Sequence, residues 1–181
     1  MSRQTLFVKI TQTILVCLLN TTIFSQSESD RIAEIKRMYN EVTQLGEQNC
    51  IVKTMVDKID VSGKFYEVEQ KAEFCDVNST YSIVKGVISD WEYEEELFAY
   101  YINGKLFFVF IKFYNVATEG ELRYYFYENS DIAQILQKNT STGDDLNLVP
   151  NIKVESEEET SEFLSYLYGD LEKIQQILYQ E

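Results

Sequence analysis

The chemistry open to this sequence is limited first by the residue types it lacks. With no histidine, it holds no Ser-His-Asp triad, no Cys-His dyad and no His-ligated zinc. Phosphate-binding loops, dinucleotide-binding glycine motifs, Gly-x-Ser-x-Gly and calcium loops are also absent. The 30 acidic residues make some close carboxylate pair almost inevitable, so no pair by itself indicates a glycosidase. We therefore expect a non-enzymatic protein with no catalytic residue, no metal and no cofactor.

Two cysteines have the spacing for a cross-link. A two-residue turn at Ser62-Gly63 sets Cys50 directly opposite Cys75 in a hairpin, at a position where the Cα atoms of the two strands approach closely. The same register sets Lys58 opposite Glu67, which is a favourable cross-strand charge pair. We predict a structural disulfide between the two cysteines, because a redox-active pair is more usually a Cys-x-x-Cys.

Aromatic side chains are the other unusual group, with Tyr 13 and Phe 11 in the composition. Asn103-Gly104 is the strongest hairpin signal in the chain, and an unbroken register around it predicts aromatic residues on both faces. It also sets Glu95 opposite Lys112. One face then carries the candidate binding residues Trp91, Tyr93, Tyr101, Phe108 and Tyr114. The other face carries Phe98, Tyr100, Phe107 and Phe113, and the sequence does not choose between the two.

These residues are expected to lie in one α+β domain over residues 26–181. Strand-forming residues crowd 50–138, with turn signals at short intervals, which predicts a single antiparallel meander of about six or seven strands. Residues 117–120 are expected to be a loop between two of them. A polar loop is expected over 139–155.

Helices are predicted at each end of the meander, over residues 26–47 and 156–180. Ser27 and Ser156 are candidate N-caps, and each is followed three residues later by an acidic residue. Apolar residues recur behind both caps at helical spacing. We expect the two helices to pack side by side on one face of the sheet, which leaves the other aromatic face to a partner, a ligand or the curvature of the sheet.

Residues 1–25 have the layout of a signal peptide. Arg3 and Lys9 precede an apolar stretch from Ile10 to Leu19, which is too short for a membrane span. An uncleaved anchor is the alternative. Cys17 lies inside this stretch and is expected to be lost on cleavage. The protein is therefore expected to be exported, periplasmic or extracellular, with no stable membrane insertion after cleavage.

Part of the chain resembles a group of small exported bacterial proteins. The resemblance rests on the aromatic run from Leu97 to Phe110, on the segment from Glu121 to Phe126, and on a helix like Asp30–Lys36 before the strands. It covers residues 26 to 138 and implies an N-terminal helix followed by an aromatic-rich antiparallel meander. The resemblance implies no activity.

The function expected from these observations is that of an exported binding or structural protein that acts through an aromatic sheet face. Its partner is expected to be a protein or a small apolar ligand. A second copy of the chain, which would make a homodimer, is one such protein partner. A net charge of -14 disfavours nucleic acid. That acidity favours, as the second alternative, an inhibitor or immunity-type protein that binds a basic enzyme by electrostatic steering. A carboxylate-based hydrolase is the third.

Overall fold

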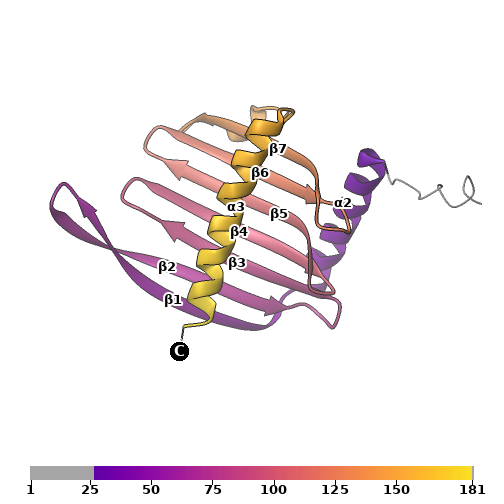
Figure 1. Ribbon diagram of the computed structural model, residues 1–181, viewed down its shortest axis with the longest axis horizontal. Coiled ribbons are helices and arrows are strands. Elements are labelled where there is room, and N and C mark those ends of the chain that lie inside the picture. Colours follow the sequence, from indigo (N-terminus) through magenta and orange to yellow (C-terminus); the bar gives the residue numbers. More distant parts are fainter. Residues whose placement is uncertain (1–26, 181) are drawn as a thin grey trace, which may run out of the picture.

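The computed structural model describes residues 27–180, and its centre is one open antiparallel sheet of eight strands (Figure 1). The strands lie in chain order, so each pairs with the one before it. The expected signal peptide and Cys17 lie outside the described residues. The strands are β1 (Gln48–Val61), β2 (Lys64–Asp76), β3 (Tyr81–Ser89), β4 (Tyr93–Ile102), β5 (Lys105–Asn115), β6 (Thr118–Phe126), β7 (Ile132–Ser141) and β8 (Ile152–Lys153).

The α+β class and the meander are confirmed, but the expected number of strands was too low. The additional strand is β8, which lies in the segment 139–155 that was expected to be loop and pairs with β7. A short 3-10 helix, η1 (Leu146–Leu148), precedes it. The expected loop over 117–120 is also wrong, because β6 begins at Thr118 and Gly120 is buried within it. Gly120 is needed for packing there, since a Cβ would lie 2.6 Å from the backbone oxygen of Lys138.

The first hairpin follows the predicted register from Ile51 to Val61, and the register shifts between Gln48 and Ile51. Ser62 and Gly63 have φ values of 55° and 80°, the left-handed conformation that a tight two-residue hairpin turn requires. Lys58 pairs with Glu67, and the two side chains form an ion pair of 3.7 Å. The predicted disulfide is confirmed, because Cys50 and Cys75 are joined with their Cα atoms 4.1 Å apart.

The second hairpin departs from the predicted register after its first two pairs. Tyr101 pairs with Leu106, but Tyr100 pairs with Phe108, so Phe107 is an extra residue in β5. A bulge of this kind moves every later side chain of the strand to the opposite face. The predicted face assignment is therefore wrong beyond the bulge. Glu95 lies opposite Phe113, not opposite Lys112, which pairs with Glu96.

Both predicted helices are present at the predicted places. Helix α2 (Glu28–Leu45) begins at the cap Ser27, whose side chain accepts a hydrogen bond from the Asp30 amide. Helix α3 (Glu157–Leu178) begins at Ser156, which accepts from the Glu159 amide. Among residues 27–180, no helix is both long enough and apolar enough to cross a membrane.

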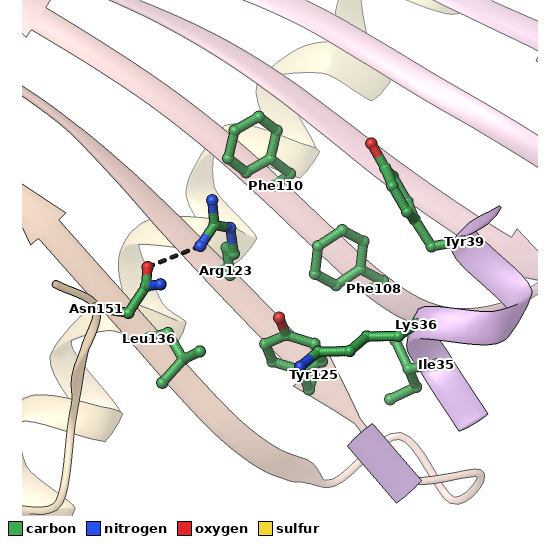
Figure 2. A pocket seen from close by; sticks show the side chains of 9 residues that line it. All are labelled: Ile35, Lys36, Tyr39, Phe108, Phe110, Arg123, Tyr125, Leu136 and Asn151. Carbon is green, nitrogen blue, oxygen red and sulfur yellow. Dashed lines mark hydrogen bonds between the residues drawn. The ribbon is translucent and has the colours of Figure 1, made fainter. Parts of the chain in front are cut away.

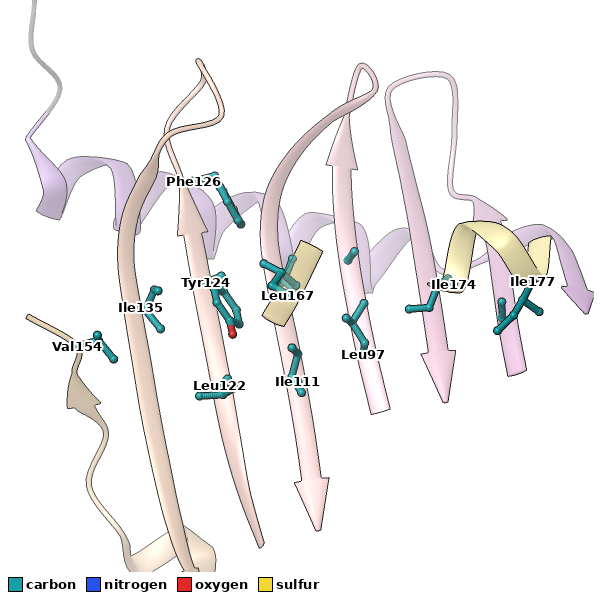
Figure 3. Packing of buried hydrophobic residues seen from close by; sticks show 13 residues of the cluster. Leu97, Ile111, Leu122, Tyr124, Phe126, Ile135, Val154, Leu167, Ile174 and Ile177 are labelled. Atoms are coloured by element: carbon teal, nitrogen blue, oxygen red, sulfur yellow. The ribbon is translucent and has the colours of Figure 1, made fainter. Parts of the chain in front are cut away.

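The two helices cover opposite faces of the sheet, which corrects the expectation that they share one (Figure 1). Helix α3 packs through Leu167, Ile174 and Ile177 on one face, as Figure 3 shows, while α2 lies behind the strands. Ile35 of α2 is buried on the other face. The physical reason is that both faces are apolar, so each needs its own cover. Gly86 lets α3 approach closely, because a Cβ there would lie 2.2 Å from Ile174 Cδ1.

Candidate functional site

A pocket of about 320 Å³ lies between α2 and the middle of the sheet, and we call it the α2-face pocket (Figure 2). Helix α2 supplies one wall, and β5, β6 and β7 supply the floor. Asn151, the residue before β8, closes one side of the pocket. The lining residues are Ile35, Lys36, Tyr39, Phe108, Phe110, Arg123, Tyr125, Leu136 and Asn151.

Four of the nine residues that line the α2-face pocket are aromatic, and their rings contact one another. The ring centroid of Phe108 lies 5.4 Å from that of Tyr39 and 5.1 Å from that of Tyr125. Edge-on and tilted contacts at these distances are favourable between aromatic rings. Phe108 is buried, whereas Phe110 and Tyr39 are partly exposed. The pocket therefore presents a preformed apolar wall that is open to solvent.

The two charged side chains that line the α2-face pocket, Lys36 and Arg123, are both cations. Arg123 donates hydrogen bonds to Asn151 at 2.7 Å and to Glu121 at 2.6 Å, and its guanidinium lies 5.5 Å from the Phe110 ring centroid. Lys36 is exposed and has no ion pair among residues 27–180. Burial raises the pKa of the Tyr125 hydroxyl, which is therefore a neutral hydrogen-bond donor at physiological pH.

The predicted binding residues do not gather on one face, because the bulge at Phe107 separates them. Phe108 lines the α2-face pocket. Tyr114 is exposed, lies on the same side of the sheet and donates a hydrogen bond to Glu94. Tyr93 and Tyr101 lie on the α3 side. Trp91 lies in the turn before β4, where its ring is 4.0 Å from that of Tyr66.

A second cavity, of about 670 Å³, lies between the first half of α3 and the sheet, and we call it the α3-face cleft. Two of its lining residues, Tyr93 and Tyr166, donate hydrogen bonds to the same carboxylate oxygen of Glu95, at 2.6 and 2.5 Å. Glu95 is completely buried. Its other oxygen, and one oxygen of Asp170, receive no hydrogen bond from an N–H group of the described residues. Burial and the nearby Glu95 raise the pKa of Asp170 from its ordinary value of 3.8 to about 8.

The raised pKa of Asp170 predicts that stability falls as pH rises. The folded protein keeps a proton on Asp170 that the unfolded chain releases above pH 3.8, so the free energy of unfolding decreases as the pH approaches 8. Asp170 is partly buried, so solvent screening limits the effect. Asp170→Asn should raise the free energy of unfolding at pH 8 by about 1 to 2 kcal/mol, with no gain near pH 4. The titratable groups that interact with Asp170 are Tyr93 and Glu95 on β4, Tyr124 on β6 and Lys173 on α3.

Urea unfolding at the two pH values measures this difference. Asp144→Asn, in an exposed loop, is the matched control and should change stability equally little at both. An Asp170→Asn variant with the same pH dependence as the parent protein would contradict the assignment.

The cations of the α2-face pocket and the acid pair beneath the α3-face cleft were not among the residues predicted from sequence. A signal for Arg123 exists, because it lies two residues from Tyr125 on the same face of β6, and Lys36 adjoins the apolar stripe of α2. No such signal marks Glu95 among 30 acids. Comparisons with protein-family models, curated proteins and solved structures find no match.

Proposed function

We propose that this is an exported binding protein whose α2-face pocket takes a small ligand with a flat apolar body and an anionic group. One observation carries the proposal: aromatic rings and two cations line the same preformed pocket. Small-molecule sites have this composition, with apolar and aromatic walls and a few polar groups that orient the ligand.

The size and shape of the α2-face pocket support the apolar part of the ligand. Its volume of about 320 Å³ lies at the lower end of the range for small-molecule sites. Tyr39, Phe108 and Phe110 offer ring surfaces from two sides, from α2 and from β5 (Figure 2). A planar ring would stack or pack edge-on against them.

The charged residues at the α2-face pocket support the anionic group of the proposed ligand. The protein as a whole carries 30 acidic and 16 basic residues, so its long-range field repels anions. Arg123 forms an ion pair with Glu121, but Glu121 also pairs with Lys138 at 3.3 Å, so these three side chains together keep one positive charge. With the exposed Lys36, they make the α2-face pocket locally positive. Charge-assisted hydrogen bonds from a lysine or arginine to a carboxylate or sulfonate are among the stronger polar contacts.

Export is supported by the disulfide. The bond between Cys50 and Cys75 is of a kind that persists in oxidising compartments outside the cytosol. It agrees with the signal peptide expected from the sequence of residues 1–25, and the two observations are independent.

The binding proposal is tested with two dyes that differ in charge. 8-Anilinonaphthalene-1-sulfonate is planar and anionic, and N-phenyl-1-naphthylamine is the same ring system without the sulfonate. We expect the anionic dye to bind more tightly to the parent protein. Combining Lys36→Gln with Arg123→Gln should weaken the anionic dye by about tenfold or more, because charged hydrogen bonds contribute roughly 1.5 to 3 kcal/mol. The neutral dye should be unaffected, and fluorescence titration measures both.

Arg37→Gln provides the matched control. Arg37 is the residue after Lys36 on α2, is 69% exposed, and lies 3.7 Å from Glu41 outside the pocket lining. Its loss should leave the affinity for both dyes unchanged, whereas Tyr39→Ala should weaken both. Equal losses in the Arg37→Gln variant and in the Lys36→Gln, Arg123→Gln variant would refute the assignment of the anion to this pocket.

A further inference from the structure

The α3-face cleft has the opposite charge character from the α2-face pocket. It is also the larger of the two, at about 670 Å³ against about 320 Å³. The one charged side chain in its lining is Glu162, which is exposed. The lining residues are Tyr93, Phe113, Asn115, Leu122, Gln137, Asn139, Glu162, Phe163 and Tyr166.

Glu95 lies directly behind the aromatic lining of the α3-face cleft. The hydroxyls of Tyr93 and Tyr166, which line the cleft, lie 2.5 Å from each other, and both donate to Glu95. The second oxygen of Glu95 is buried and receives no hydrogen bond from an N–H group of the described residues, and the protonated carboxyl of Asp170 forms a hydrogen bond with Glu95. A carboxylate in such a position is costly unless a nearby positive charge compensates it.

No basic side chain of residues 27–180 forms an ion pair with Glu95 or Asp170. Lys173 favours the ionised form of Asp170, but it is about one third exposed and forms an ion pair with Asp57 at 3.3 Å. Asp170 is protonated near neutral pH, so the charge that remains beneath the α3-face cleft is that of Glu95, and no cation of residues 27–180 pairs with it. This charge would stabilise a positive charge in the cavity.

The walls of the α3-face cleft supply the second half of a cation site. Tyr93 and Phe113 stack with ring centroids 6.4 Å apart and an interplanar angle of 24°, and Phe163 and Tyr166 add two more rings from α3. The faces of aromatic rings carry partial negative charge and attract ammonium groups, most strongly where water is excluded.

We propose that the α3-face cleft is a second binding site, which takes an organic ammonium cation. The rings hold the ammonium group and its alkyl or aryl substituents. Glu162 at the rim and Glu95 behind Tyr93 and Tyr166 supply the negative charge. This site is independent of the α2-face pocket, because it lies on the other face of the sheet and selects for the opposite charge.

Three compounds that share one ring separate charge from shape. They are 2-phenylethylamine, which is a cation at neutral pH, 2-phenylethanol, which is neutral, and phenylacetate, which is an anion. Isothermal titration calorimetry should show the amine binding about tenfold more tightly than the alcohol, a ratio within the range of desolvated cation–π contacts. The comparison is made in the Lys36→Gln, Arg123→Gln background, which removes the charges of the other pocket. Equal affinity for the amine and the alcohol would overturn the proposal.

Substitutions in and behind the α3-face cleft test where the ammonium group binds. Glu162→Gln should lower the affinity for the amine about threefold, and Glu95→Gln about tenfold, each with no change for the alcohol. Phe163→Leu keeps the apolar bulk and should remove part of the preference for the amine. Glu158→Gln removes an equal charge from the same helix outside the cleft and should change nothing. If Glu95→Gln does not fold, Glu162→Gln and Phe163→Leu still decide, and unchanged amine affinity in both would refute the site.

Discussion

Replacing Leu167 with alanine is expected to lower the free energy of unfolding by about 3 to 5 kcal/mol. Leu167 is completely buried where α3 crosses the sheet (Figure 3). The change removes apolar contact and leaves a cavity, because the strands beneath cannot collapse into the space. Equilibrium urea unfolding measures the loss. Leu148→Ala is the matched control, since Leu148 is 82% exposed and should cost less than about 0.5 kcal/mol.

Because the two helices lie on opposite faces of the sheet, a second substitution beneath α2 tests whether the two faces are energetically independent. Ile35→Ala, beneath α2, should cost about 2 to 4 kcal/mol on its own. Because the sheet separates Ile35 from Leu167, the two losses should add to within about 0.5 kcal/mol in the double variant. A coupling of 1 kcal/mol or more would contradict packing on separate faces.

Removing the disulfide is expected to have the next largest effect. The double variant Cys50→Ser, Cys75→Ser should lose about 2 to 4 kcal/mol of unfolding free energy, because the bond closes a loop across a sequence separation of 25 residues and restricts the unfolded chain. The fold should persist, since β1 and β2 also pair along most of their length. Chemical denaturation and the far-ultraviolet circular dichroism spectrum report the two outcomes.

Thiol counting gives the independent check on this bond. A preparation that spans residues 26–181 should contain no free thiol when it is denatured without reductant, and the parent protein treated with a dithiol should match the stability of the double variant. Two free thiols per chain in the untreated protein would show that the bond is absent.

Local signals in the sequence predicted much of this fold. The capping serines Ser27 and Ser156 fix helix starts through side-chain contacts within one turn. Ser62-Gly63 and Asn103-Gly104 fix hairpin turns because both residues of each turn adopt positive φ. The pairing of Cys50 with Cys75 followed from the first of these turns alone.

The sequence did not predict the longer-range features of the fold, and the reasons are physical. The bulge at Phe107 has no turn residue to mark it, and it shifted the predicted faces of every later residue in β5. The placement of α2 and α3 on opposite faces depends on how much apolar surface each face exposes, which the register controls. Glu95 was hidden among many acids, because its burial depends on Tyr93 and Tyr166, which come from elements far apart in the chain.

The order of the strands along the chain also determines the order in which they can pair during folding. Each strand of the meander pairs with the one before it, so a chain that emerges from its amino end can extend the sheet one hairpin at a time. The disulfide hairpin is complete first and α3 arrives last. Until α3 docks, the face that contains Leu97, Ile111 and Tyr124 is open to other chains. Docking of the final 22-residue helix therefore ends the period of greatest aggregation risk during folding.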